Sequence, residues 1–244
     1  MEAPLENTEQ ILDKVRKALH SEPKIDLAHH PLRLSWAVGD LTIEGEVADI
    51  AAKKLALERA AAVAGVLGIV DRLRVTPAEP MGDDQIRTLV CDALQQDTAF
   101  AACTISAWDK GKLDVVQAPE PSAGTITVAV NNCVVTLDGD VPGLGLKRLA
   151  GVLAWWVPGS GDVINGLGVT PPEDDNDEEI TDAIRIALEK DPFVNADQVR
   201  VSTHNAIVTL DGLVPKESER DMAEFDAWYV FGVDKIVNRI KVRP

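Results

Sequence analysis

One pattern of residues occurs three times along this chain and restricts its fold more than any other feature. Each copy has a first glycine, an alanine 15 positions later, a second glycine 20 positions after the first, and a valine 10 positions beyond the second. The six glycines are Gly45 and Gly65, Gly139 and Gly159, and Gly212 and Gly232. Three ungapped matches of this length predict one small structural unit in three tandem copies.

A stripe of apolar residues with helical spacing precedes each pair of glycines. Its members lie at i, i+4, i+7 and i+8 in every copy, so they share one face of a helix. They are Ile11, Val15, Ala18 and Leu19, then Ile86, Val90, Ala93 and Leu94, then Ile180, Ile184, Ala187 and Leu188.

Two alternating segments, an alanine-bearing helix and a last strand follow each stripe, giving the order helix, strand, strand, helix, strand. The sequence therefore predicts an α+β fold of three tandem small α/β sandwiches. Each is expected to be a three-stranded sheet covered by two helices. The predicted domains are residues 7–76, 83–170 and 177–243.

The first copy illustrates the expected helix boundaries. Its first helix is predicted over about residues 7–20, with Asn7 or Thr8 as the cap that accepts from free amides of the first turn. Its second helix is predicted over residues 48–64 because of the alanine content, with Gly65 ending it.

The second copy is longer than the others. From its first apolar helix position to its first glycine it takes 53 residues, against 34 and 32 in the other two. About twenty residues are therefore inserted. We expect them within residues 103–124, where they would form a hairpin or an ordered surface loop.

Composition excludes some partners. The chain has 40 acidic and 24 basic side chains, a formal charge of −16, and no segregated basic patch, so nucleic acid is not an expected partner. The cysteines Cys91, Cys103 and Cys133 lack CxxC spacing and are interpreted as free thiols in a reducing compartment, with a single pair as the alternative. The first residues show no signal peptide and no apolar run is long enough to span a bilayer, so a cytoplasmic location is expected, with peripheral envelope association as a further possibility.

The linker between the second and third copies, residues 171–179, is strongly acidic. Its carboxylates lead into the predicted first helix of the third copy, where negative charge suits the positive end of the helix dipole. A calcium site is the alternative, although the glycine and terminal glutamate spacing of a calcium-binding helix-loop-helix is absent.

The repeated pattern resembles the BON domain, named for bacterial osmotic-shock-induced and nodulation proteins. The resemblance depends on the Leu/Ile-x-Gly-x-Val strand end, the alanine-bearing helix, the second glycine and the terminal Val-x-x-x-Leu-x-Val strand, and it covers nearly the whole chain. It implies an α-β-β-α-β sandwich, a binding rather than catalytic role, and association with transport, osmotic stress and membrane integrity. Some relatives are thought to bind phospholipid, and one cytoplasmic relative is a potassium sensor.

The family supplies no catalytic set that maps onto this sequence, and its glycines are positional. Gly65, Gly159 and Gly232 are predicted to end a helix at a positive backbone angle, where a side chain would be strained. Many relatives are exported, whereas no export signal is visible here.

A search for catalytic motifs gives no constellation. The four histidines are scattered, so a zinc site is the less favoured interpretation against ordinary loop histidines. GxSxG, phosphate-binding-loop and HExxH motifs do not occur in the sequence. The sequence therefore predicts that the protein is not an enzyme, and neither a cofactor nor a metal site is predicted, apart from potassium without a located site.

The second helix of each copy carries the most informative side chains. In the second and third copies, large apolar residues lie opposite the stripe that should face the sheet, whereas the first copy is polar or small there. The candidate partner-binding residues are Val152, Trp155, Trp156, Phe225, Trp228 and Tyr229.

Two explanations for these outward rings remain open. Either the second and third copies pack on each other or the insertion covers Trp155, or the rings contact a phospholipid surface or a protein partner, because indole and phenol groups suit a wet–dry boundary. Lys147 and Arg148, next to the tryptophans, are candidates for contact with a headgroup, although a snorkelling role on the helix flank is favoured.

We expect a non-enzymatic BON-domain binding protein, related to stress or osmotic conditions, that contacts phospholipid or protein partners through these helix faces. The alternative is a cytoplasmic potassium-responsive sensor, for which backbone carbonyls would be the natural ligands.

Overall fold

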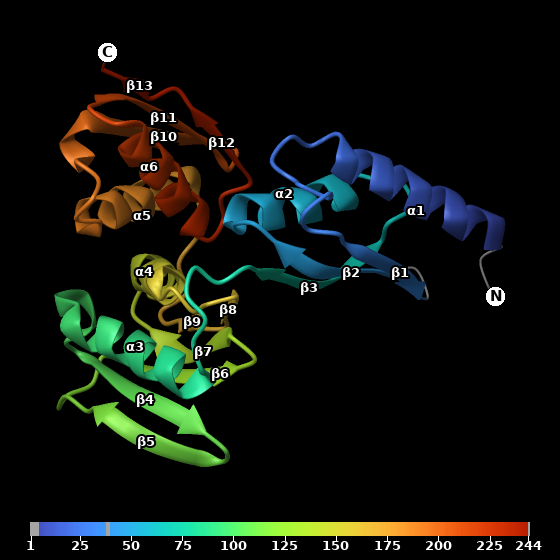
Figure 1. Ribbon diagram of the computed structural model, residues 1–244. Coiled ribbons are helices and arrows are strands. Elements are labelled where there is room, and N and C mark those ends of the chain that lie inside the picture. The colour runs from blue at the N-terminus through green and yellow to red at the C-terminus, as the bar shows by residue number, and fades with distance from the viewer. Residues whose placement is uncertain (1–4, 38–39, 244) are drawn as a thin grey trace. The chain divides into compact units, whose positions relative to one another are not determined.

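The computed structural model describes residues 5–37 and 40–243, and within these ranges the chain forms six α-helices and thirteen strands (Figure 1). Two compact units divide at the Thr76–Pro77 bond. The first unit contains one copy of the repeat and the second contains two. None of the described helices is long and apolar enough to cross a membrane.

The first unit has the predicted element order. Its elements are α1 (Leu5–His20), β1 (Arg33–Ala37), β2 (Asp40–Val47), α2 (Ile50–Ala61) and β3 (Gly68–Val75). β1 runs antiparallel and β3 parallel to the central strand β2. Both helices contribute to one core with the sheet, in which Val15 of α1, Ala56 of α2 and Ile43 of β2 are fully buried.

The helix boundaries of this unit differ from the sequence-based ones. α1 begins at Leu5, so Asn7 and Thr8 lie inside the helix and the predicted cap is wrong. α2 begins after Asp49, whose carboxylate accepts from the amide of Ala52 at 2.8 Å. That bond satisfies one of the free amides of the first turn and fixes the start of the helix.

The second copy of the repeat has the largest sheet. Its elements are α3 (Asp83–Gln96), the short 3-10 helix η1 (Thr98–Phe100), β4 (Cys103–Asp109), β5 (Lys112–Gln117), β6 (Gly124–Asn131), β7 (Val134–Val141), α4 (Leu144–Trp156), β8 (Asp162–Asn165) and β9 (Gly168–Val169). The strand order is β5-β4-β6-β7-β8, with β9 also paired to β7.

The third copy returns to the simpler plan. Its elements are α5 (Asp177–Lys190), η2 (Ala196–Gln198), β10 (Val199–His204), β11 (Ile207–Val214), α6 (Glu217–Tyr229), β12 (Lys235–Asn238) and β13 (Lys241–Val242). β10 is antiparallel to β11, while β12 and β13 are successive parts of one parallel partner strand.

The predicted α+β class and the threefold repeat are confirmed, with one difference in the second sheet. β4 pairs in parallel with β6, and β5 pairs antiparallel with β4, so two strands extend the sheet beyond the expected three. Without them β6 would be an edge strand with unpaired backbone groups, and β4 supplies the missing hydrogen-bond partners.

Glycine is required at the second glycine position of the copies for two different physical reasons. Gly65 and Gly232 have positive φ angles of 105° and 92°, in the range that favours glycine. Gly159 does not have a positive φ, so the prediction of a left-handed residue is wrong there. A Cβ atom on Gly159 would lie 2.7 Å from the Cβ of Met81. Glycine is required there because the segment that leads into α3 packs closely against this turn.

One carboxylate in the first turn of a helix holds the hairpin turn in each of the last two copies. Asp83 of α3 accepts from the amides of Asn132 and Cys133, both at 2.9 Å. Asp177 of α5 accepts in the same way from Asn205 at 2.7 Å and Ala206 at 2.9 Å. These turn residues have positive φ, which points their amides away from the strands and leaves them in need of an acceptor.

The Asp177 contact makes stability depend on pH. The backbone amides of Ala206 and Asn205 lower the pKa of Asp177, so its contribution is present above the ordinary carboxyl pKa and is lost as pH falls through the lowered value. We expect Asp177→Ala to lower the melting temperature at pH 7, and the difference from the wild type to shrink in strong acid. Calorimetry of both chains across pH tests this, with Asp182→Ala, which removes an exposed carboxylate of the same helix, as the control. Equal losses in the two variants would contradict it.

Candidate interaction site at the junction of the second and third copies

Helix α4 lies at the junction of the two copies in the second compact unit. It packs on its own sheet through β7 and β8, and on α5 and α6 of the third copy. Most residues between Leu144 and Ala154 are buried, as expected for a helix that is apolar nearly all round. The candidate residues on α4 therefore lie between two copies of the repeat.

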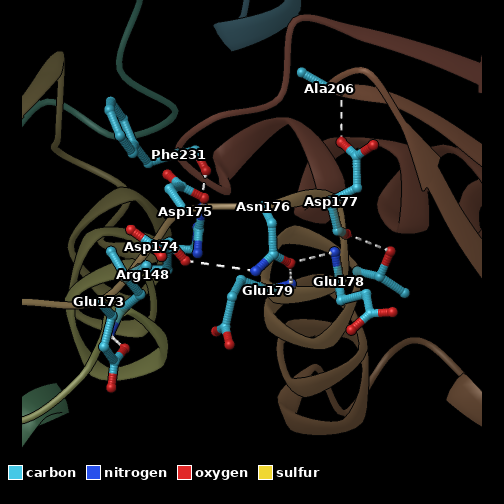
Figure 2. A network of polar contacts seen from close by, with 12 residues as sticks. Arg148, Glu173, Asp174, Asp175, Asn176, Asp177, Glu178, Glu179, Ala206 and Phe231 are labelled. Carbon is cyan, nitrogen blue, oxygen red and sulfur yellow. Dashed lines mark hydrogen bonds and ion pairs between the residues drawn. The ribbon is translucent and has the colours of Figure 1, made fainter.

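A buried cation lies at the centre of this junction. The side chain of Arg148 on α4 is fully buried, its Nε donates to the carbonyl oxygen of Phe231 at 3.1 Å, and its Nη2 bonds to the carboxylate of Asp175 (Figure 2). A guanidinium taken out of water needs such compensation because the desolvation penalty of a charge is several kcal/mol. The contact joins α4 to the linker and to the third copy.

The acidic linker is ordered by contacts on both sides (Figure 2). The carboxylate of Glu173 accepts from the amide of Leu144 at 2.7 Å, at the start of α4. Asn176 caps α5 by accepting from the amides of Glu178 at 2.9 Å and Glu179 at 3.1 Å. The linker thus serves two helix N-termini and one buried arginine. Among the described residues, no group of His, Cys, Asp or Glu is arranged to hold a metal.

The aromatic residues of α4 and α6 meet across the junction. The rings of Trp155 and Tyr229 stack with centroids 5.9 Å apart and an interplanar angle of 21°. The indole N–H of Trp156 donates to Asp226 at 3.1 Å. Stacked rings add a directional contribution to the apolar area that they bury. These contacts use part of the ring surface that the sequence placed opposite the sheet.

The candidate residues fall into two groups by exposure. Val152, Arg148 and Trp228 are each 1% exposed. They are not accessible to a membrane or a separate partner in this arrangement, which corrects their assignment as contact residues. The partly exposed residues are Trp155, Trp156, Phe225, Tyr229 and Lys147. Trp156 also packs against the core of its own copy.

Phe231, just after α6, is a contact residue that the sequence analysis missed. It is 57% exposed, and the ammonium group of Lys147 lies 5.8 Å from its ring centroid. A large apolar ring followed by Gly232, outside any helical stripe, was the available signal. The position of Lys147 beside it shows that this end of α4 reaches the surface at the junction.

A second charged contact connects the two copies. Lys190, the last residue of α5, forms an ion pair of 2.7 Å with Asp97 at the end of α3. The side chain of Asp97 is 9% exposed. Sequence reasoning did not select either residue, because both lie at helix ends where charge is common.

The three copies place different charges at one equivalent pair of positions. In the first copy, Arg59 of α2 bonds to the carboxylate of Glu22 at 2.7 Å. In the third copy, Asp226 is the equivalent of Arg59, because both lie six residues before the second glycine. Asp191 is the equivalent of Glu22, because both lie eleven residues after the first residue of the apolar stripe. An ion pair is thus replaced by two carboxyl groups.

Asp226 of this pair is buried, whereas Asp191 is partly exposed, and the pKa of Asp226 is shifted. Asp226 is 3% exposed, and burial raises its pKa to about 8, with a further increase from the nearby carboxyl group of Asp191. The Trp156 N–H acts in the opposite direction because it stabilises the carboxylate. With its pKa raised to about 8, Asp226 keeps its proton at neutral pH.

The described structure defines a tandem-repeat α+β protein with ordered contacts between two of its copies. The chain belongs to the BON domain family: the family model for the BON domain matches residues 7–77, 113–171 and 176–244. The second match starts at residue 113, within β5, so that α3 and the added strand β4 lie outside it.

Comparison with other known proteins adds little. No curated protein matches the chain. Among solved structures, the chain is similar to the C-terminal domain of CdsD, described as the structural protein of the type III secretion system of Chlamydia trachomatis, with 12% identity, full coverage of both chains and a TM-score of 0.25. A second CdsD structure has 14% identity, covers 96% of this chain and 93% of that chain, and has the same TM-score of 0.25.

The junction predicts a large effect of removing the buried arginine. Arg148→Ala leaves a cavity and deprives Asp175 and the Phe231 carbonyl of their donor, so we expect a loss of about 2–3 kcal/mol in the free energy of unfolding of the second unit. Arg185→Ala, which removes an exposed arginine of an i,i+3 pair on α5, is the matched control with an expected loss below about 0.5 kcal/mol. Denaturant unfolding measures both, and equal losses would contradict a role of Arg148 in the junction.

The acid pair predicts a pH dependence with a defined sign. Because the pKa of Asp226 rises on folding from 3.8 to about 8, the folded state holds a proton that the unfolded state releases. Stability from this group is complete below the lower value, falls by up to about 1.4 kcal/mol per pH unit between the two, and stays low above the higher one.

Asp226→Asn tests this directly because an amide reproduces the protonated carboxyl. We expect the variant to be more stable than the wild type at pH 7.5, with the difference becoming smaller toward pH 5. Calorimetry at several pH values measures it, and Asp221→Asn on the surface of the same helix is the control. A constant difference across pH would refute the assignment of the proton to Asp226.

Proposed function

We propose that this protein is a non-catalytic binding protein in which the second and third BON domains act together as one binding unit. The observation that carries this proposal is the junction itself, where Arg148 of α4 bonds to both Asp175 of the linker and the Phe231 carbonyl. Compensated burial of a charge fixes the geometry of the groups around it. Two domains held in this way present a composite surface that neither has alone.

The part of this surface best suited to contact is the patch formed by Lys147 and Phe231. Phe231 is exposed, and Lys147 lies against its ring. An apolar ring beside an ammonium group can insert among acyl chains while the charge stays at the phosphate level. This supports contact with a phospholipid surface, as peripheral association with an envelope would require.

The overall charge limits which membranes qualify. A formal charge of −16 opposes approach to an anionic bilayer over roughly the Debye length of 8 Å at physiological salt. A zwitterionic phospholipid surface is therefore the form of the proposal that the charge supports. A protein partner that covers the same patch is the alternative outcome.

Vesicle flotation tests the proposal. We expect the wild type to float with phosphatidylcholine vesicles and Phe231→Ala to bind at least about tenfold more weakly, since an inserted phenyl ring contributes on the order of 1.5–3 kcal/mol. Phe193→Ala, which removes another exposed phenylalanine of the third copy, is the control and should float like the wild type. No flotation of the wild type with any vesicle composition would reject the lipid form and leave a protein partner.

Potassium binding stays a prediction from the family resemblance. Calorimetric titration with K+ and Na+ separates it from a general ionic effect, because a sensor should respond to K+ alone. No heat with either ion would remove this alternative.

A further inference from the structure

The open face of the second sheet differs from the corresponding faces of the other two copies. Residues directly opposite each other on paired strands share one face, and here the row across the sheet is Leu113, Trp108, Ala129, Thr136 and Ile164. The helix α3 and the buried residues of the core lie on the other face. Trp108 and Leu113 come from the added strands β4 and β5, so this row has no counterpart of the same length in the sister copies.

A cavity of about 410 Å³ lies on this face. It is lined by Trp108, Thr127, Ala129, Thr136, Asp138 and Gly139. The hollow forms because Ala129 is small while the indole of Trp108, 45% exposed, stands beside it on the neighbouring strand. Its volume is within the range of pockets that take small molecules. None of the six lining residues is basic.

The sister copies show which residue stands opposite the position of this carboxylate elsewhere. Directly opposite Glu44 on the first sheet stands Arg33, and their charged groups are 3.5 Å apart. On the third sheet Arg200 stands opposite Asp211 in the same register. Each arginine lies 12 residues before the first glycine of the repeat in its copy.

In the second copy the residue at that register position is Thr127, opposite Asp138. The carboxylate thus keeps its place while the cross-strand arginine is absent. The nearest lysines of the added hairpin have other acidic partners, Lys110 with Asp109 at 3.7 Å and Lys112 with Asp114 at 2.6 Å.

We propose that this cavity binds a small organic cation of the alkylguanidinium type, which takes the place that an arginine side chain fills in the sister copies. The planar guanidinium pairs with the carboxylate of Asp138 and packs on the face of Trp108, an arrangement that combines an ion pair with a cation–π contact. The hydroxyl groups of Thr127 and Thr136 offer acceptors to the remaining N–H groups. The alkyl chain lies over Ala129.

The affinity follows from the openness of the site to water. Exposed ion pairs and cation–π contacts each contribute little, so we expect a dissociation constant on the order of 1 mM for butylguanidinium. Selectivity is the stronger signature. A neutral analogue of the same shape, butylurea, should bind at least about tenfold more weakly because it gains neither charged contact.

NMR titration of the full ¹⁵N-labelled chain at constant ionic strength tests the proposal. With butylguanidinium we expect saturable shifts of the Trp108 indole N–H and of the backbone amides of Thr127 and Ala129. Trp108→Ala and Asp138→Asn should each weaken binding about three- to fivefold. Shifts of the same size at Arg33 and Arg200 would indicate unspecific attraction to an acidic surface and overturn the site.

The sister copies provide the decisive variant. Thr127→Arg installs the arginine of the other sheets and should abolish binding, because the new guanidinium occupies the site from within the chain. Arg200→Thr is the matched control: it removes the arginine from a sheet that has no tryptophan wall, so the shifts should stay in the second copy with unchanged affinity. Unchanged binding by Thr127→Arg would refute the proposal.

A peptide arm distinguishes the source of the cation. The tripeptide acetyl-Gly-Arg-Gly-amide should bind no more tightly than butylguanidinium if the ligand is a small molecule. Binding of this peptide tenfold more tightly would overturn that assignment. The result is independent of vesicle flotation, since the cavity on the sheet and the patch at Lys147 and Phe231 share no residue.

Discussion

The guanidinium of Arg148 is the group on which the second compact unit depends. A buried cation needs acceptors to offset its lost hydration, and Arg148 takes them from positions 27 and 83 residues away, through its Nε and Nη2. Its Nη1 is buried without a hydrogen-bond partner. The linker must therefore be ordered at Asp175, and the turn after α6 must present the Phe231 carbonyl. The capping bonds of Glu173 and Asn176 follow from the same constraint, since a linker fixed at one carboxylate brings its neighbours to the adjacent helix ends.

The three copies serve as internal comparisons of charge at fixed geometry. At one equivalent pair of positions the first copy has a glutamate and an arginine, the second has Asp97 and an apolar Leu153, and the third has Asp191 and Asp226. The fold accommodates all three because each charge is compensated differently. Glu22 pairs with Arg59 of its own copy, Asp97 pairs with Lys190 of the next copy, and Asp226 keeps its proton because its pKa is raised. Repetition preserved the fold while the polar contacts diverged.

Sequence periodicity predicted the elements well, because the helical stripes and alternating strands are local properties. The helix wheel also located the rings of α4 and α6 away from the sheet stripe. It did not show that Trp155 would stack on Tyr229 or that Val152 would be buried, because periodicity says which side of a helix is apolar and not what covers it. The pairing of Asp226 with Trp156 was equally inaccessible, since it joins residues 70 positions apart.

The inserted strands have one further effect, at the rim of the second sheet. In the described part of the chain β5 pairs only with β4, so its outer row of backbone amides and carbonyls faces solvent. Such a rim invites strand addition between molecules, yet Lys112 and Asp114 place two charges within three residues there. The extended sheet thus carries its own protection against edge-to-edge pairing with a second molecule.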